Sequence, residues 1–305
     1  MAVQVGSARI NENGELEGGK LGDQTGKEVM IENWYLHAKG WYVIRAIDAS
    51  ARAKIAQNMR YICENDNIGY SYWNNAYGLT NEAKKYKYDA SKVKVKVDTN
   101  CAKSARLCIL YAGIEVDDFS TADELEACER TGKFIILKDD KYTKTSDYLL
   151  EGDILVTRTK AHTVVVMSNG SKAIAYTPYR IGNCAACNLR KGDSKDTESL
   201  GILHPGDKVE LYGRGKNNWG RVRYKNTYGY VSPLYLIEYD KAKTSGKVWL
   251  REGVGTSKAG IVAIPSNTTV YITGNVKKNG NTPWYEVIFA GLKGWSSGAY
   301  VKTMK

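Results

Sequence analysis

Two side chains in the sequence have the types and settings needed for nucleophilic catalysis, Cys101 and His162. Cys101 lies in the stretch DTNCAKSARLC, where a predicted helix follows a predicted strand. The unpaired N–H groups of a helix N-terminus stabilise an anion, and the thiolate is the reactive form of cysteine. A cysteine nucleophile also needs a base, usually a histidine. This setting predicts a thiolate held ionised near neutral pH; the alternative interpretation of Cys101 is a small core residue.

Three histidines are available as the base. His204 lies in an HPGD turn and is interpreted as a loop residue, and His37 lies in a segment without a clear pattern. His162 opens the apolar stretch HTVVVM, shortly after Gly152-Asp153. Because a histidine at the start of a strand beside a packed sheet can reach a cysteine on a helix, we predict His162 as the base.

The other cysteines are predicted to be free thiols without a catalytic role. Cys63, Cys108 and Cys128 are interpreted as buried residues, and the cysteines are too sparse for a disulfide scaffold. Cys184-Ala-Ala-Cys187 suggests zinc or redox chemistry, but no second pair follows, which favours a packing role. We expect no metal and no cofactor.

The stretch GGKLGDQTGKEV superficially resembles a phosphate-binding loop. The spacing before Gly26-Lys27 is wrong, and Glu28 stands where a serine or threonine would hold magnesium, so we exclude nucleotide binding. Residues 1–30 as a whole are rich in glycine and polar residues and predict an arm or extended loop.

Two helices and several strands are predicted to position the candidate residues. The apolar periodicity indicates a helix from Asp48, which can cap its start, to about Glu64, and another from Asn100 to Tyr111. The alternation of valine with lysine over residues 93–97 is typical of a half-buried strand.

The stretch DILVTRTKAHTVVVMSNGSKAIAY predicts three strands separated by turns, with Asn169-Gly170 as a hairpin signal. Helices followed by strands indicate an α+β domain rather than a doubly wound sheet.

Charge is distributed unevenly along the chain. Residues 1–172 contain 24 basic and 24 acidic residues, whereas residues 173–305 contain 20 basic and 9 acidic residues. The C-terminal part is therefore expected to have a polyanionic partner, such as nucleic acid, an acidic membrane or an anionic cell wall. No stretch approaches the roughly 18–20 apolar residues of a membrane span, and no secretory signal is recognisable at the N-terminus.

An internal repeat occupies the C-terminal part. Val209-x-Leu211 recurs as Val270-x-Ile272 at an offset of 61, and NWGRVRY recurs as PWYEVIF at an offset of 65. A four-residue insertion in NVKKNGNTP accounts for the change of offset. Each copy reads as short strands broken by turns, which predicts a small all-β barrel.

These copies resemble the bacterial SH3-like wall-binding domain. The first supplies NLRKGDS, HPGDKVELYG, NWGRVRY and YGYVSPLYL, and the second supplies WLREGVGTS, PWYEVIF and KGWSSGAYV. The second lacks the Pro-Gly turn and has Pro265-Ser266-Asn267 in its place. The resemblance implies two small all-β SH3-like barrels, over residues 178–240 and 241–305, that hold the protein to the cell wall.

Residues 1–172 resemble the NlpC superfamily of cell-wall cysteine peptidases, whose papain-like fold is shared with CHAP-type amidases. The stretches LLEGDI and HTVVV match its second motif, whereas the first motif, usually Asp-Cys-Ser, is replaced by Asn100-Cys101-Ala102, with Asp98 three residues before the cysteine. The arm, the helix that leads to IGY and the two barrels are together similar to endolysins of phages that infect clostridia and related Gram-positive bacteria.

The resemblance implies that Cys101 attacks a peptide amide, that His162 takes its proton, and that the helix N-terminus holds the oxyanion. A tyrosine upstream of the cysteine often positions or polarises the substrate in this superfamily. Tyr70, in IGYSYW, stands at a comparable place, with Tyr72 close by as an alternative.

The resemblance also implies a third polar residue that orients the histidine, usually on the next strand. That position falls near Ile174, which cannot orient an imidazole, and Asn169 and Thr177 are the nearby polar options. A dyad oriented by backbone or water is the alternative.

The expected function is that of an endolysin-type peptidoglycan hydrolase, made in the host cytoplasm and acting on the wall. The NlpC resemblance implies a D-glutamyl–diamino-acid endopeptidase. The alternatives are an N-acetylmuramoyl-L-alanine amidase of the CHAP type and a wall-binding protein with a decayed peptidase domain. The expected partners are bacterial peptidoglycan and anionic wall polymers; nucleic-acid binding is disfavoured because the aromatic residues of the repeat occupy packing positions.

Overall fold

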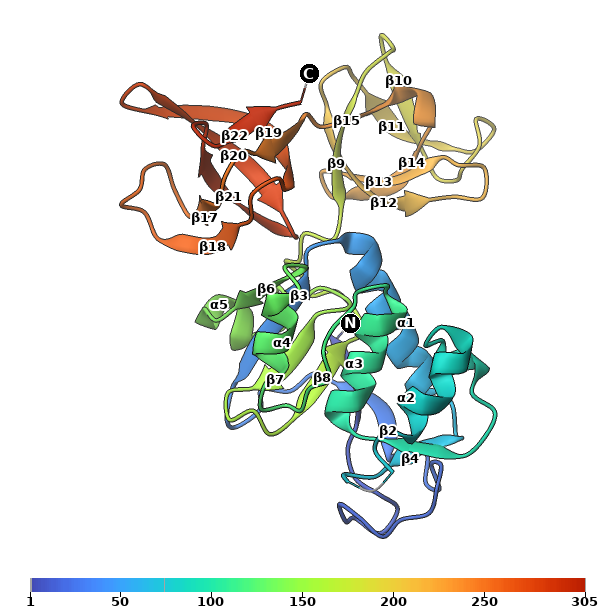
Figure 1. Cartoon of the computed structure of the whole chain (residues 1–305). Helices are drawn as coiled ribbons and strands as arrows, with labels where there is room; N and C mark the ends of the chain where they lie inside the picture. The colour runs from blue at the N-terminus through green and yellow to red at the C-terminus, as the bar shows by residue number, and fades with distance from the viewer. Residues whose placement is uncertain (1, 74, 305) are drawn as a thin grey trace. The chain divides into compact units, whose positions relative to one another are not determined.

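The computed structural model describes residues 2–73 and 75–304, and the chain divides into two compact units, Met1–Ala173 and Ile174–Lys305 (Figure 1). The first unit combines helices with a sheet, and the second contains strands and one short 3-10 helix among its described residues. The α+β class expected for the first unit and the all-β class expected for the second are both confirmed.

The first unit is built on a six-stranded antiparallel sheet in the order β2-β1-β8-β7-β3-β6. A separate parallel pair joins β4 to β5. The strand bounds are β1 Gln4–Ala8, β2 Val29–Asn33, β3 Trp41–Ala46, β4 Ile68–Tyr70, β5 Val97–Thr99, β6 Phe134–Leu137, β7 Ile154–Thr157 and β8 Thr163–Val166.

Helices α1 (Ala49–Cys63) and α3 (Cys101–Tyr111) pack against each other and against strands β1 and β8 (Figure 1). Both helices begin where the sequence predicts, because the side chain of Asp48 caps α1 and that of Asn100 caps α3. The shorter helices of this unit are α2 Gly78–Ala83, η1 Lys84–Tyr86, η2 Ala90–Lys92, α4 Glu124–Arg130 and α5 Asp140–Thr143.

The predicted half-buried strand over residues 93–97 is wrong. Val93 follows the 3-10 turn η2, Val95 is 50% exposed, and β5 begins only at Val97. The side chain of Asn65 donates hydrogen bonds to the carbonyl oxygens of Ala90 and Val93, at 3.3 and 3.0 Å. A side chain therefore satisfies backbone groups that a neighbouring strand would satisfy in a sheet.

The interpretation of residues 1–30 as an arm is wrong for Gln4–Ala8. Strand β1 lies between β2 and β8, so it is an inner strand of the sheet. The loop that follows is held by buried carboxylates: Glu28 accepts hydrogen bonds from the N–H groups of Gln24 and Tyr70, at 2.7 and 3.2 Å. Glu28 therefore has a structural role at the position where a phosphate loop would need serine or threonine.

The predicted hairpin at Asn169-Gly170 and the strand after it are also wrong. The side chain of Asn169 accepts from the N–H of Glu151 at 2.9 Å, and the N–H of Gly170 donates to the carbonyl oxygen of Leu149 at 2.8 Å. The segment therefore closes against residues 147–151. The next strand, β9 (Thr177–Ile181), pairs with strands of the second unit.

The Gly-Asp pair ahead of β7 has a structural role. Gly152 has a φ of +84°, and a Cβ there would lie 2.0 Å from the carbonyl oxygen of Arg52, so only glycine fits. The Asp153 carboxylate accepts from the N–H of Leu150 and forms a fully buried ion pair with Arg45 of β3.

The second unit contains two seven-stranded antiparallel sheets with the same strand arrangement, β11-β10-β14-β13-β12-β9-β15 and β18-β17-β21-β20-β19-β16-β22. The inserted residues of the second copy extend the β19–β20 hairpin. The bounds are β9 Thr177–Ile181, β10 Cys187–Arg190, β11 Ser199–Leu203, β12 Lys208–Arg214, β13 Gly220–Tyr224, β14 Thr227–Val231, η3 Pro233–Tyr235, β15 Leu236–Glu238, β16 Lys241–Thr244, β17 Val248–Arg251, β18 Gly260–Ile264, β19 Thr269–Asn279, β20 Thr282–Phe289, β21 Leu292–Ser297 and β22 Val301–Thr303.

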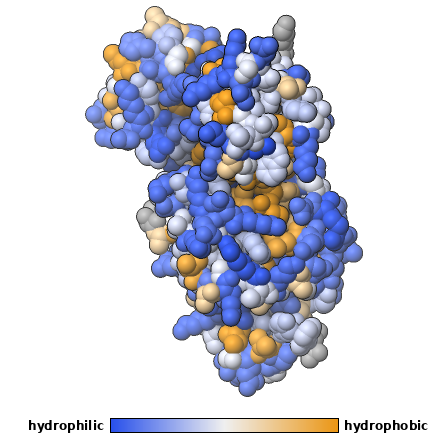
Figure 2. Space-filling view, turned by 90° about the vertical axis from the view of Figure 1, so that its left-hand side faces the viewer, coloured by the Kyte–Doolittle hydropathy of each residue, from blue (hydrophilic) through white to orange (hydrophobic). Residues whose placement is uncertain are grey.

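The surface in Figure 2 is predominantly hydrophilic, with separate apolar areas. In the first unit, the exposed apolar side chains include Leu16, Leu21 and Trp73, of which Trp73 is 70% exposed. Within the described residues, we find no helix whose length and apolar character would suit a membrane span.

Candidate active site

Cys101 is the first residue of α3, directly after the turn that leaves β5. The side chain of the N-cap residue Asn100 accepts from the N–H of Lys103 at 2.9 Å and donates to the carbonyl oxygen of Tyr72 at 3.0 Å. The cap therefore fixes both the start of the helix and the loop beside it, which sets the position of the Cys101 thiol.

The Cys101 thiol faces backbone N–H groups from two elements. The N–H of Thr163, at the start of β8, and the N–H groups of Cys101 and Ala102 all favour the ionised thiol, but burial outweighs them and raises the pKa of Cys101 to about 11. Cys101 is 8% exposed. The expectation of a thiolate held ionised near neutral pH is therefore wrong for the structure as it stands, because burial penalises the charged form more than the N–H groups stabilise it.

His162 directly precedes β8, so it lies beside the residue whose N–H faces the Cys101 thiol. Its backbone is fixed by hydrogen bonds with Thr157, which accepts from the His162 N–H through its hydroxyl at 3.2 Å. Burial, together with the charges of Arg9 and His37, lowers the pKa of the His162 imidazole to about 4. The imidazole is therefore neutral over the physiological range and free to accept a proton.

The packing of α3 on β8 brings the two predicted residues to the same end of β8. No described residue forms a hydrogen bond with the imidazole nitrogens of His162. The candidate site thus combines a neutral thiol at the start of α3 with a neutral imidazole directly before β8.

Tyr70 lies close to Cys101. The parallel register of β4 and β5 pairs Tyr70 with Thr99, two residues before Cys101. Tyr70 is 4% exposed, and burial, followed by the nearby Cys101, raises the pKa of its phenol well above the usual value. Tyr72 is 36% exposed, and its ring lies edge-on against that of Trp73, with the ring centroids 4.4 Å apart.

The side chain of Asn169, one of the polar options for orienting the histidine, accepts a hydrogen bond from the N–H of Glu151. Ile174 and Thr177 belong to the second unit. On the edge opposite β7, β8 pairs with β1, in the register Val5 with Val166. A strand from the start of the chain therefore occupies the edge where the next strand in sequence was expected.

Residues from the N-terminal part of the chain lie near His162, and of these only His37 was considered as a candidate base. Continuation of the β1–β8 register places Arg9 opposite His162, and Arg9 pairs with Glu32 at 2.6 Å. After β2, the ring of His37 contacts those of Tyr35 and Trp41, with centroids 6.2 and 5.3 Å away. The aromatic run NWYLH was visible in the sequence, but only the strand pairing connects it to His162.

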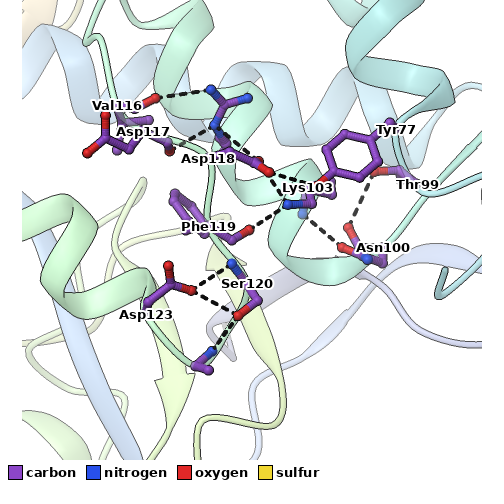
Figure 3. A network of polar contacts seen from close by, with 12 residues as sticks. Tyr77, Thr99, Asn100, Lys103, Val116, Asp117, Asp118, Phe119, Ser120 and Asp123 are labelled. Atoms are coloured by element: carbon purple, nitrogen blue, oxygen red, sulfur yellow. Dashed lines mark hydrogen bonds and ion pairs between the residues drawn. The ribbon is translucent and has the colours of Figure 1, made fainter.

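A polar network fixes the loop on the other side of α3 (Figure 3). The Nζ of Lys103 donates to Asp118 and to the carbonyl oxygen of Phe119, both at 2.8 Å, and lies over the ring of Tyr77. The Tyr77 hydroxyl also donates to Asp118, at 2.7 Å. This network holds the segment that leads into α4.

The six cysteines are free thiols, as expected. Cys187 lies in the core of the first sheet of the second unit, and Cys184 packs against that core, which agrees with a packing role. In residues 2–73 and 75–304, no group of three or more potential ligand side chains could hold a metal ion.

The protein is of the class in which an α+β unit with a candidate cysteine–histidine site is followed in the chain by all-β sheets. The chain belongs to the family of proteins with an endolysin-like domain, which matches residues 5–173. Residues 185–237 match the bacterial SH3 domain. The expected combination of an endolysin-like part with an SH3-like part is thus confirmed.

Among curated proteins, the chain is similar to the "Cell wall-binding protein YwsB" of Bacillus subtilis (strain 168), with 32% identity over 116 residues. The match covers 36% of this chain and 64% of that relative, so the chain spans less than two thirds of its length. Solved structures of NlpC2 and NlpC1 from Trichomonas vaginalis show 17% and 15% identity. They cover 42% and 41% of this chain, and 48% and 45% of their own chains, each with a TM-score of 0.24.

Proposed function

We propose that the protein is an endolysin-type peptidoglycan hydrolase that cleaves an amide bond in the peptide part of the wall, with Cys101 as the nucleophile. The observation that carries the proposal is the position of the Cys101 thiol, in the first turn of α3 and facing the N–H of Thr163, next to His162. The endolysin-like family match supports a wall substrate.

The proposed reaction begins from the neutral pair. The resting pair is neutral because burial raises the pKa of Cys101 to about 11 and lowers that of His162 to about 4. His162 therefore takes the thiol proton only as the sulfur attacks the carbonyl carbon. The N–H groups of Cys101 and Ala102 and the hydroxyl of Tyr70 are the candidates for holding the oxyanion. The imidazolium then protonates the leaving amine, and water hydrolyses the thioester to restore the thiol.

The scissile bond proposed is the D-glutamyl–diamino-acid amide, which the NlpC resemblance implies. An N-acetylmuramoyl-L-alanine amidase of the CHAP type would use the same nucleophile on a different bond. Mass analysis of the released fragments distinguishes them: a new amino terminus on the diamino acid supports the endopeptidase, whereas intact stem peptides support the amidase. We also propose that the protein is encoded by a phage, as its resemblance to endolysins implies.

We further propose that residues 178–240 and 241–305 are two SH3-like modules that hold the enzyme to the wall. The match to the bacterial SH3 domain supports the first, and the repeated strand arrangement supports the second. This part of the chain contains 20 basic and only 9 acidic residues, which suits binding to anionic wall polymers. The attraction between them would weaken as the salt concentration rises.

The first sheet carries a partly exposed aromatic surface that suits a wall ligand. The ring of Tyr212 lies between those of Tyr176 and Tyr228, with centroids 5.8 and 5.7 Å away, and Arg223 contacts two of the three rings. In the second copy the repeat places Thr273, Ile288 and Lys293 at the positions of Tyr212, Arg223 and Tyr228. The two modules should therefore bind the wall through different contacts.

A wall-binding protein without catalysis is the second candidate function. The low exposure of Cys101 and the absence of a hydrogen-bonded partner for His162 among the described residues favour it, as does the relative described as a cell wall-binding protein. The two candidates differ in what Cys101 does, so a substitution there separates them.

The decisive experiment compares the wild type with Cys101→Ala on a suspension of purified walls, with Cys184→Ala as a control in the second unit. Loss of turbidity with the wild type and Cys184→Ala, but not with Cys101→Ala, supports the hydrolase. Sedimentation with walls should be unchanged in all three proteins. Equal effects of wild type and Cys101→Ala on turbidity would exclude catalysis through Cys101.

A further inference from the structure

A buried carboxyl group lies behind the proposed nucleophile, outside the residues used in the proposed reaction. Glu124, the first residue of α4, is 0% exposed. Its Oε1 lies 3.1 Å from the hydroxyl oxygen of Thr163, and its Oε2 has no hydrogen-bond partner among the described residues. A buried oxygen without a partner is costly and calls for an explanation.

The hydrogen bonds of Thr163 indicate which group carries the proton. The Thr163 hydroxyl oxygen lies 3.0 Å from the carbonyl oxygen of Leu155 and 3.1 Å from Glu124 Oε1. A carbonyl oxygen can only accept, and a hydroxyl has one proton to donate. If that proton goes to Leu155, both short contacts are satisfied only when Glu124 is protonated and donates to Thr163.

We propose that Glu124 is a positioning residue that acts on Cys101 through Thr163, whose hydroxyl it holds while the Thr163 N–H faces the thiol. The neutral acid fixes the start of β8 without placing a charge beside the sulfur. This proposal deepens the proposed function and rests on Cys101 being the nucleophile.

The groups that face Glu124 agree with a protonated resting state. The Cys101 thiol faces it from α3 and the Thr163 hydroxyl from β8, while Asp123 and the Cys128 thiol belong to its own helix. None of these groups is a cation, and β6, which packs on α4, has the uncharged sequence FIIL. Burial accordingly raises the pKa of the Glu124 carboxyl to about 8.

The loop network in Figure 3 holds the segment that directly precedes Glu124. Asp118 and Phe119 are tied to Lys103 on α3, and Asp123 accepts from the N–H and hydroxyl of Ser120 at 2.8 and 2.9 Å. Glu124 follows directly, so its position depends on the helix that carries Cys101. Ionisation of Glu124 at alkaline pH would place a negative charge near the sulfur and oppose thiolate formation.

The test measures the iodoacetamide alkylation rate of Cys101 by mass spectrometry from pH 6.5 to 9.5, in the full-length wild type and in Glu124→Gln. The amide donates to Thr163 but does not titrate. We expect equal rates at pH 6.5 and a rate about threefold to tenfold higher in Glu124→Gln at pH 9. Exposed Glu126, on the same helix and paired with Lys160, provides the control Glu126→Gln, which should follow the wild type.

A second variant, Glu124→Leu, separates the charge from the hydrogen bond. Like Glu124→Gln, it should lack the slowing of Cys101 alkylation that ionised Glu124 causes at alkaline pH. Its kcat on walls should fall about tenfold with KM nearly unchanged, because Thr163 is no longer held. A ratio of Glu124→Gln to wild-type alkylation that does not change with pH would overturn the proposal, as would a folded Glu124→Gln with no activity beside an active wild type. If the wild type itself hydrolyses no wall while the alkylation ratio changes as expected, the proposed function fails and the coupling to Cys101 stands.

Discussion

Arg45 and Asp153 form an ion pair with an N–O distance of 2.7 Å, in which both side chains are completely buried. The Arg45 Nε also donates to Asp153, at 2.8 Å, so the contact is bidentate. It joins β3 to the turn before β7, the strand that pairs with β8. The Gly-Asp motif is thereby connected to the sheet that carries His162.

Asp153→Asn should strongly destabilise the first unit, because it leaves the Arg45 charge buried without a counter-charge. We expect a loss of about 3–5 kcal/mol in the free energy of unfolding, measured by urea denaturation. Asp140→Asn, which breaks the exposed pairs with Lys144 and Arg158, should lose far less stability. Similar losses in both variants would show that the buried pair has no special weight.

His162 should make the protein less stable in acid. Its folded pKa of about 4 lies below the ordinary value of 6.5, so the unfolded chain binds more protons between these pH values. Stability therefore rises with pH across this range, by roughly 3 kcal/mol at most. Between pH 7.5 and pH 5, the free energy of unfolding should fall more in the wild type than in His162→Gln.

The same neutral imidazole should extend wall hydrolysis into mild acid. The acid limb of kcat/KM reports the base of the free enzyme, so its midpoint should lie near pH 4 to 5 rather than 6.5. An acid limb with its midpoint at pH 6.5 would contradict the lowered pKa of His162.

Tyr70→Phe should lower kcat about tenfold to hundredfold with little loss of stability, since it removes one hydroxyl beside Cys101. Hydrolysis of purified walls at saturating substrate measures the effect. Tyr72→Phe is the matched comparison because Tyr72 lies two residues away and its ring contacts Trp73 instead. If the Tyr72 substitution has the larger effect on kcat, the assignment of Tyr70 to the site is wrong.

Wall attachment should depend on the aromatic surface of the first sheet. Tyr228, 51% exposed, and Arg223 are the members most open to a ligand, so Tyr228→Ala and Arg223→Gln should each weaken sedimentation with walls about fivefold. Tyr86→Ala removes a tyrosine of the first unit that is 40% exposed and should have no effect. Unchanged binding of both Tyr228 and Arg223 variants would place the wall contact elsewhere.

Local patterns predicted the elements that depend on local interactions. The caps at Asp48 and Asn100 and the apolar periodicity defined α1 and α3, and the repeat predicted the duplicated strand order of the second unit. The valine–lysine alternation misled because the side chain of Asn65 satisfies the backbone there, which no periodicity reveals.

The candidate site was predictable only in part, for the same reason. Cys101, His162 and Tyr70 lie at the ends of elements that local patterns identify. Arg9 and Glu124 reach the site through pairing and packing between distant segments. A single arginine or glutamate is too common in sequences to indicate such a contact. The protonation of Cys101 also depends on burial, whereas helix position alone favoured the thiolate.

Because β1 lies between β2 and β8, the sheet that contains β8 is complete only when residues about 160 positions apart in the sequence pair with each other. Such long-range closure slows folding. A chain emerging from the ribosome has its first strand long before the partner exists, so the thiol and the imidazole are assembled only after nearly the whole unit has been synthesised.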